Sequence, residues 1–472
     1  MNNSGSLRFH FSTTGIRGNV SKDLTPQFCF EAGRAIANWA KTHMIENPKV
    51  LIGRDYRFSS DLILSSLLSG LLAEGLNVNI IEDQAPTPAI IQYLLEKSYD
   101  IAIIVTGSHL PPEDNGIILV DGKGNYFRGI LESMPESGNV SWSEFGSFGL
   151  VHDYLSTYLS HLREFASQLQ LTKQDLRIFL DPVGGPMAKP LSKILQEYVE
   201  DVVGINLDPN PKIDFRPSEP KPETLVKTLD YFKGGIFDLG ITTDFDGDRV
   251  IFITPSGRIL TGDYIGAVIA KYFWELDSSS KVVIPINTSA IISDLSKKMN
   301  TKFVYCQVGA PKIIEKMKET DAIFGFEETG KYFFRDFCLY PDSAVTSLFL
   351  LHILQQTGQT LDDLIQELPT YFQLKTKTPS ARETSDVLMK RLELDLDDLV
   401  SSLGDGVEII QIHKLDGLRI DFSDGSWLLL RQSGTEDNLR VFSESKSEEI
   451  AKMLNDKGLA YVKQKQKELK LL

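Results

Sequence analysis

The chain has 472 residues, 49 of them basic and 64 acidic, and its formal net charge is −15. That balance excludes broad binding to nucleic acid or to an anionic membrane, because both need a basic face. The length exceeds what one hydrophobic core holds, and it predicts several domains of roughly 150 residues each.

The cysteines and the N-terminal stretch indicate in which cellular compartment the protein is expected. Cys29, Cys306 and Cys338 are far apart and share no metal-binding spacing. They indicate free, buried thiols in a reducing environment. The N-terminal stretch has no apolar signal segment, and no apolar run approaches the ~20 residues of a membrane span. We therefore expect a cytoplasmic protein without a membrane partner.

Strands and helices alternate along the first third of the chain. The pattern predicts strands at 49–53, 78–81 and 100–105. It predicts helices at 60–75 and 87–97, the first with a Ser/Asp start and a Gly stop. This alternation is typical of an α/β fold. A segment rich in Ser and Gly at 135–149 indicates a domain boundary.

The same alternation continues and then changes in the last hundred residues. Further strands are expected at 177–181, 202–205, 237–243, 281–286, 302–309 and 322–330, and a helix at 343–358. The C-terminal elements are shorter. We expect three similar mixed α/β domains and a smaller α+β domain, with boundaries at 1–148, 149–255, 256–369 and 370–472.

The segment "TTDFDGDRV" places Asp244, Asp246 and Asp248 at alternate positions after an apolar strand. In an extended segment these side chains point to one side, where three carboxylates repel unless a cation compensates them. Oxygen ligands of this kind suit Mg²⁺, and Arg249 beside them could bind a phosphate. The alternative is a solvated acidic turn.

Two more segments carry candidate ligand groups. "RQSGTEDNLRVF" surrounds Gly434 with hydroxyls and guanidiniums, which is the inventory of a phosphate cradle or of a hairpin turn with a salt-bridged rim. "FGFEETGKYFF" carries Glu327, Glu328, Thr329 and Lys331 in a glycine-flanked loop. Carboxylates there could accept hydrogen bonds from sugar hydroxyls, but the segment taken alone favours an acidic turn.

Ser108 and His109 follow the apolar strand at 100–105. A serine beside a histidine is reminiscent of hydrolases. Neighbours in a chain usually point apart, however, and the G-x-S-x-G elbow is absent. The sequence therefore argues against a Ser-His-Asp hydrolase, and leaves a serine that caps a turn or carries a chemical group.

Together these segments resemble the α-D-phosphohexomutases, the family of phosphoglucomutase, phosphomannomutase and phosphoglucosamine mutase. The matching blocks, in order, are "FSTTGIRG" (11–18), "TGSHLPPEDNG" (106–116), "DFDGDR" (244–249), "GFEETGK" (325–331) and "RQSGTEDNLRV" (431–441). "LTPQ", "GRDYRFSS", "PTPA" and "PSEPKPETL" also fit, most like the archaeal phosphoglucosamine/phosphomannomutase branch. The resemblance covers essentially the whole chain.

The resemblance implies four domains around a central cleft and a phosphoryl group on Ser108. Mg²⁺ would bind Ser108, Asp244, Asp246 and Asp248. Arg17, His109 and Arg249 would join Ser108 in catalysis, with Glu327, Thr329 and Lys331 at the sugar and Arg431, Ser433, Gly434 and Thr435 at the non-reacting phosphate. The substrate would be a phosphorylated hexose, and a hexose 1,6-bisphosphate would act as primer.

The chain departs from the family pattern at several positions. Leu110 stands where the family usually has Asn, and Ile118 where it usually has Lys; Ala310, Lys331 and Gln432 also differ. Three hypotheses follow. The first is an active mutase in which His109 or Lys331 takes over part of the missing lysine's role. The second is a weakened paralogue that binds sugar phosphates as a sensor or partner subunit. The third is a phosphatase phosphorylated on Asp244. The sequence chooses neither the sugar nor the oligomeric state.

Overall fold

The computed structural model describes residues 10–11, 14–43, 47–127, 141–403, 408–433 and 437–469. The chain divides into two compact units. The first comprises Met1–Gly262 and Thr329–Asp363, and the second comprises Asp263–Glu328 and Leu364–Leu472. Each unit is treated separately below.

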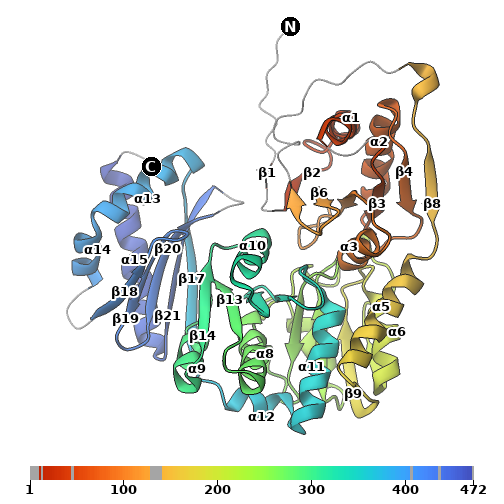
Figure 1. The fold of residues 1–472 in the computed structure, drawn as a ribbon. Coiled ribbons are helices and arrows are strands. Elements are labelled where there is room, and N and C mark those ends of the chain that lie inside the picture. The colour runs from red at the N-terminus through yellow and green to blue at the C-terminus, as the bar shows by residue number, and fades with distance from the viewer. Residues whose placement is uncertain are drawn as a thin grey trace. The chain divides into compact units, whose positions relative to one another are not determined.

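An eight-stranded sheet forms the N-terminal part of the first unit, in the order β1-β2-β6-β5-β3-β4-β8 with β7 beside β6 (Figure 1). Strands β5, β3, β4 and β8 are parallel, β6 runs antiparallel between β5 and β2, and β2 therefore has the direction of β5. The strands are β1 (His10–Phe11), β2 (Gly15–Asn19), β3 (Val50–Arg54), β4 (Val78–Ile81), β5 (Ile101–Val105), β6 (Asp114–Asp121), β7 (Tyr126–Phe127) and β8 (Phe148–Val151).

Helices cover both faces of this sheet. The elements are α1 (Pro26–His43), α2 (Ser60–Ala73), α3 (Thr87–Glu96) and a short 3₁₀ helix, η1 (Trp142–Glu144). Val50 and Ile52 of β3 face a core shared with α1 and α2. Gly53, the next position on β3, instead faces Ile90 of α3. Because side chains alternate along a strand, α3 lies on the opposite face.

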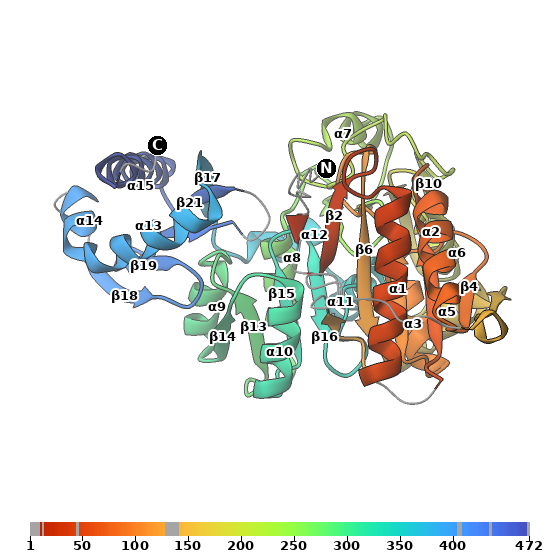
Figure 2. The ribbon, with the colours of Figure 1, turned by 90° about the horizontal axis from the view of Figure 1, so that it is seen from above.

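Helices α1 and α2 lie side by side and meet at two glycines (Figure 2). A Cβ added at Gly33 would stand 2.2 Å from the Leu67 carbonyl oxygen, and one added at Gly70 would stand 2.1 Å from the Phe30 carbonyl oxygen. No side chain fits in either place, so the two helix backbones touch.

The rest of the first unit holds a four-stranded sheet of order β10-β9-β11-β12. Strands β10, β9 and β11 are parallel, and β12 returns antiparallel to β11. The elements are α5 (Tyr154–Gln168), β9 (Gln174–Asp181), α6 (Ala188–Tyr198), β10 (Val199–Gly204), α7 (Val226–Lys233), β11 (Leu239–Thr243), β12 (Val250–Ile253), β16 (Lys331–Phe334) and α11 (Ser343–Thr357). Helix α12 (Leu361–Gln366) follows at the unit boundary.

The second unit has a parallel sheet, β14-β13-β15, and an antiparallel sheet of order β17-β21-β20-β19-β18. The first group of elements is α8 (Gly262–Leu276), β13 (Lys281–Pro285), α9 (Ile291–Met299), β14 (Lys302–Cys306), α10 (Ala310–Thr320) and β15 (Phe324–Glu327). The second is β17 (Phe372–Pro379), α13 (Arg382–Leu394), α14 (Leu396–Leu403), β18 (Ile409–His413), β19 (Leu418–Phe422), β20 (Trp427–Gln432), β21 (Asn438–Ser445) and α15 (Glu448–Glu468). Helices α13–α15 share one core with the antiparallel sheet.

The predicted fold class, mixed α/β domains followed by an α+β part, is confirmed. The predicted division at 148, 255 and 369 remains a prediction. Among the helices that the structure describes, none combines the length and the hydropathy of a membrane span.

Candidate functional site

Ser108 lies in the loop between β5 and β6, and its backbone φ is +48°. A serine in this left-handed region is strained by roughly 1–2 kcal/mol. The Thr106 hydroxyl helps to hold it: its oxygen accepts from the Ser108 N–H at 2.9 Å, and its proton is donated to Asp55 at 2.8 Å. Tertiary contacts therefore impose a conformation that the local sequence does not favour.

The Arg57 guanidinium is the main support of this loop. Its terminal nitrogens donate hydrogen bonds of 2.6–3.0 Å to four carbonyl oxygens, those of Ser108, Leu110, Pro111 and Asp114. A Cβ added at Gly107 would stand 2.6 Å from the guanidinium carbon, so the loop needs glycine there. Arg57 lies 51 residues before Ser108, and no local pattern around it predicts this contact.

The three aspartates lie in the turn between antiparallel strands β11 and β12. The prediction of an extended segment is wrong. The chain bends at Gly247, where φ is +76°, and the Asp244 N–H closes the turn on the Arg249 carbonyl at 3.3 Å. The turn nevertheless brings the side chains together: one oxygen each from Asp244, Asp246 and Asp248 lies within 4.8 Å of the others.

The three carboxylates are buried and strongly coupled by charge. Burial first, and then the neighbouring carboxylates, raises the pKa of Asp244 well above its usual range. Burial, and then Asp248, raises the pKa of Asp246. Burial also pushes the pKa of Asp248 upward, but the Lys331 ammonium and the Arg249 guanidinium outweigh it and lower that pKa. A cluster of this kind gains stability from a cation.

Some carboxylate oxygens of the cluster accept hydrogen bonds from side chains, and others do not. Asp246 Oδ2 accepts a hydrogen bond from the Thr87 hydroxyl at 2.7 Å, and Asp248 Oδ2 accepts one from the Lys331 ammonium at 2.6 Å. Asp246 Oδ1 and Asp248 Oδ1 are buried without a hydrogen-bond partner among the described residues. Asp248 Oδ1 lies 4.0 Å from Arg249 Nε, within ion-pair distance. Hard oxygens that lack hydrogen bonds fit a divalent cation such as Mg²⁺.

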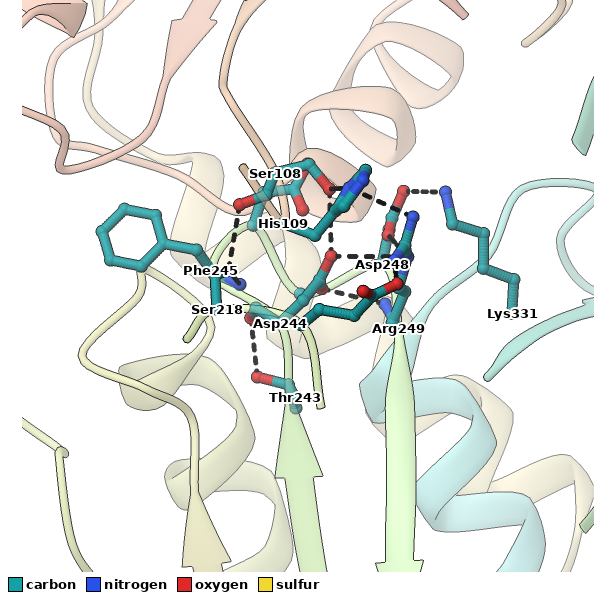
Figure 3. Close-up of polar contacts among 12 residues, drawn as sticks. Ser108, His109, Ser218, Thr243, Asp244, Phe245, Asp248, Arg249 and Lys331 are labelled. Atoms are coloured by element: carbon teal, nitrogen blue, oxygen red, sulfur yellow. Dashed lines mark hydrogen bonds and ion pairs between the residues drawn. The ribbon is translucent and has the colours of Figure 1, made fainter. Parts of the chain in front are cut away.

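The Ser108 hydroxyl reaches this cluster. Its Oγ donates to Asp244 Oδ2 at 3.0 Å, and both groups are buried (Figure 3). The structure thus brings the serine loop and the aspartate turn together, although 136 residues separate them in sequence.

His109 lies between two arginines. Its Nδ1 is 3.2 Å from Arg17 Nη1 and 3.1 Å from Arg249 Nη2, but 3.5 Å from Ser108 Oγ. A guanidinium can only donate, so Nδ1 accepts and the ring is neutral with its proton on Nε2. Burial, followed by Arg249 and Arg17, lowers the pKa of His109 well below its usual value. Because Nδ1 is engaged in this way, His109 is not arranged as a base for Ser108.

A proline-rich loop joins the two halves of the site. The Ser218 hydroxyl donates to the Ser108 carbonyl at 3.0 Å and accepts from the Phe245 N–H at 3.1 Å. Glu219, the next residue, pairs with Arg249 at 2.6 Å. Neither residue was singled out as a site residue. Only the "PSEP" resemblance marked their segment.

The Arg216 guanidinium holds the loop that carries Ser218 and Glu219. Its guanidinium donates 2.7–3.2 Å hydrogen bonds to the Asp181 carboxylate and to the carbonyl oxygens of Asp181, Pro217, Ser218 and Thr243. A buried arginine with this many partners holds the ends of two parallel strands and the loop in one arrangement.

The remaining predicted ligand residues are distributed between the units. Lys331 and Thr329 belong to the first unit, and Lys331 lies against Asp248. Glu327, Arg431 and Ser433 belong to the second, where they are largely buried.

The phosphate-loop arginine is held by an acidic partner. Arg431 Nε donates to Asp416 at 2.9 Å, and the same Asp416 oxygen accepts from the Val308 N–H at 2.9 Å. Ser433 closes the hairpin by donating its N–H to the Asn438 carbonyl at 2.9 Å. Gly434 and Thr435 lie outside the described residues.

The two main departures from the family pattern lie in the serine loop and in β6, the strand that follows it. Ile118 is a buried residue of β6 that pairs with Gly15 on one side and Ile104 on the other. Leu110 is half-buried, and its carbonyl accepts from Arg57. Neither residue offers a side-chain proton donor or charge.

Comparison with family models covers most of the chain. Residues 8–129, 156–257 and 261–372 match the models of phosphoglucomutase/phosphomannomutase alpha/beta/alpha domains I, II and III, and 387–457 match the C-terminal domain model.

Whole-chain relatives agree. A phosphoglucomutase/phosphomannomutase of Thermococcus kodakarensis is 31% identical over 456 residues, with 95% of this chain and 97% of the relative covered. A phosphoglucosamine mutase of Methanococcus maripaludis is 30% identical over 461 residues, covering 96% and 98%. A solved phosphoglucomutase/phosphomannomutase family protein of Burkholderia thailandensis has the same fold, with a TM-score of 0.78, 20% identity and 96% of each chain covered. The chain therefore belongs to the phosphoglucomutase/phosphomannomutase family of phosphosugar mutases.

Proposed function

We propose that this chain interconverts hexose 1-phosphates and hexose 6-phosphates through a phosphoserine at Ser108 and a hexose 1,6-bisphosphate intermediate. The observation that carries the proposal is the 3.0 Å hydrogen bond from Ser108 Oγ to Asp244, which sets a buried hydroxyl on a cation-binding turn. Glucosamine, mannose and glucose phosphates are the candidate substrates, in keeping with the names of the relatives.

Asp244, Asp246 and Asp248 would hold Mg²⁺, together with an oxygen of the phosphoryl group on Ser108. The bound ion would withdraw negative charge from the phosphoryl oxygens during transfer. The unpartnered oxygens of Asp246 and Asp248 support this assignment, because a buried carboxylate oxygen otherwise has a hydrogen-bond partner.

The transfer itself consists of two displacements at phosphorus. A hydroxyl of the hexose monophosphate attacks the phosphorus on Ser108, the P–Oγ bond breaks, and the sugar proton ends on Oγ. Ser108 Oγ then attacks the phosphorus of the other phosphate of the bisphosphate, the P–O bond to the sugar at that position breaks, and the Oγ proton ends on the sugar oxygen released there. Such reactions need in-line placement and charge neutralisation above all.

Fixed positive charge beside Ser108 comes from Arg17 and Arg249. Both guanidiniums are buried and are held against the neutral His109 ring, so they need little reordering when a phosphoryl group is present. Glu219 accepts from the other side of Arg249 and fixes its direction. The role of His109 is thus to position the two arginines.

The reaction has two phosphate positions on one substrate, so a second anion site is required. Arg431, Ser433, Gly434 and Thr435 would bind the phosphate that is not reacting, and Glu327 and Thr329 would bind sugar hydroxyls. Asp416 supports this assignment for Arg431, since it anchors Nε and so restricts the guanidinium.

A weakened paralogue that binds sugar phosphates without efficient turnover is the second candidate. The observation that favours it is Ile118, an aliphatic side chain in the buried strand that follows the serine loop, at the position where the family usually has Lys. The Lys331 ammonium, 2.6 Å from Asp248, favours the active mutase, because it places a lysine at the aspartate turn from a different strand.

The test begins with the state of Ser108. Intact mass and peptide mapping of the purified chain would locate any phosphate. A coupled assay would then follow glucose, mannose and glucosamine phosphates with Mg²⁺ and the matching 1,6-bisphosphate. Phosphate on Ser108 with turnover supports the proposal, and Ser108→Ala should lose both.

Two outcomes would contradict it. Binding of hexose phosphates without turnover, with turnover gained in Ile118→Lys, would support the weakened paralogue. Phosphate on Asp244 would overturn both candidates in favour of an aspartyl-phosphate phosphatase. Ser66→Ala is a control, because the Ser66 hydroxyl donates to the Leu62 carbonyl within α2 of the same domain and not to a residue of the serine loop or the aspartate turn.

A further inference from the structure

Helix α3 begins against the aspartate turn. Thr87, its first residue, donates its hydroxyl to Asp246 Oδ2 at 2.7 Å and its backbone N–H to the Asp246 carbonyl at 3.0 Å. We infer that Thr87 is a positioning residue of the cation site, one that turns Asp246 Oδ1 toward the ion. The inference rests on the proposed function only in taking the aspartate turn to bind a divalent cation.

Two bonds from one residue to one residue fix the carboxylate in a way that a single bond does not. The N–H bond holds the Asp246 backbone, and the hydroxyl holds one oxygen of the side chain, so the carboxylate cannot rotate freely. The oxygen that remains, Oδ1, is buried and has no hydrogen-bond partner among the residues described. Oδ1 is therefore the oxygen available to a cation, because the Thr87 hydroxyl binds Oδ2.

The Thr87 hydroxyl does not cap its own helix. No side-chain capping bond is formed at the start of α3, where Pro86 is the residue before the helix. The comparison with Thr25 is direct, since Thr-Pro also opens α1. There the Thr25 hydroxyl accepts from the Phe28 N–H at 3.3 Å and so caps its own helix. The two threonines share a local sequence but differ in what their hydroxyls hold.

Thr87 is also almost fully buried, with 1% of its surface exposed. Replacing it by valine keeps the shape and the backbone bond and removes only the hydroxyl. Replacing it by serine keeps the hydroxyl. The pair of variants thus separates the side-chain bond to Asp246 from the packing of α3.

The test is Mn²⁺ binding to the whole chain without sugar, followed by isothermal titration or by the electron paramagnetic resonance of the free ion. All variants are brought to the same unphosphorylated state, checked by intact mass. We expect Thr87→Val to weaken Mn²⁺ binding about 10- to 100-fold, and Thr87→Ser to stay within about threefold of the wild type. Thr25→Val, the matched control, should leave Mn²⁺ binding unchanged while losing a helix cap.

Thr87→Val with wild-type Mn²⁺ affinity and an unchanged circular dichroism spectrum would overturn the inference and leave the proposed function intact. A wild-type chain that binds no Mn²⁺ at the aspartate turn would overturn both. Should Thr87→Val not fold, Thr87→Cys is used instead, because it has a similar shape and a weak hydrogen-bond donor. Its Mn²⁺ affinity should be lower than that of Thr87→Ser, by less than about 100-fold. Equal affinities for the cysteine, serine and wild-type chains would then refute the inference.

Discussion

Replacement of Arg57 by methionine should loosen the serine loop before it affects anything else. The buried guanidinium donates to four loop carbonyls and lies 3.3 Å from the Asp55 carboxylate. Breaking one partner of a buried ion pair costs about 3–5 kcal/mol. We use that figure for the whole group, because the hydrogen bonds and the ion pair belong to one side chain and do not add.

A loss of that size should change local opening by roughly two to three orders of magnitude, since about 1.4 kcal/mol corresponds to a factor of ten. Hydrogen exchange with mass analysis of peptides covering 106–121 measures it directly. The exchange of amides in the loop should accelerate, and amides of the second sheet, in β9 and β11, should not. Arg57→Lys keeps the charge but lacks the planar fork, so we expect an intermediate acceleration.

Arg163→Met is the matched control. Arg163 makes a bidentate pair with Glu197, but its side chain is 48% exposed, and such pairs contribute about 0–1 kcal/mol. Exchange in the Arg57→Met loop within about threefold of the wild type, which corresponds to less than 1 kcal/mol, would refute the assignment of Arg57 as the support of the loop.

Three further outcomes are expected. Mg²⁺ at a hundred times its Kd should stabilise the first unit by about 2.7 kcal/mol, and Asp248→Asn should lose most of that gain in a thermal melt. Acid should destabilise the wild type through His161, because burial lowers its pKa from 6.5 to about 4 and the unfolded chain binds the proton first. This contribution is complete above pH 6.5 and falls by about 3 kcal/mol as the pH approaches 4, and the slope of stability against pH should be flatter in His161→Gln. Ile118→Lys should lower stability by about 1–3 kcal/mol by equilibrium unfolding, since it places an amine at a buried position of β6, a strand inside the sheet.

Much of the fold follows from local patterns. The short apolar runs at 49–53, 78–81 and 100–105 became β3, β4 and β5, because short runs rich in Val and Ile are typical of buried parallel strands. The strand ends also located Ser108 and Asp244 correctly within loops. Backbone geometry was harder: the alternating aspartates suggested an extended segment, and Gly247 turned it into a bend instead.

The supporting residues could not be found in this way. Thr87 reaches Asp246 across 159 residues, Arg57 reaches the Ser108 loop across 51, and Ser218 reaches it across 110. Each has an ordinary local explanation, as a helix start, a turn arginine or a loop serine. The partners of Thr87 and Ser218 are set by how the two sheets of the first unit pack, and the partner of Arg57 by the order of strands in the first sheet, and a local pattern carries no information on either.

The glycine crossing of α1 and α2 has a consequence for the site that lies at the other end of these helices. The β2 strand that carries Arg17 leads into α1, and the turn that carries Arg57 leads into α2. Because the helix backbones touch at Gly33 and Gly70, any side chain there would act as a wedge and widen the gap between two arginine-bearing segments. We therefore expect a side chain at Gly33 or Gly70 to shift the segments that carry Arg17 and Arg57, although neither glycine belongs to the serine loop or to the aspartate turn.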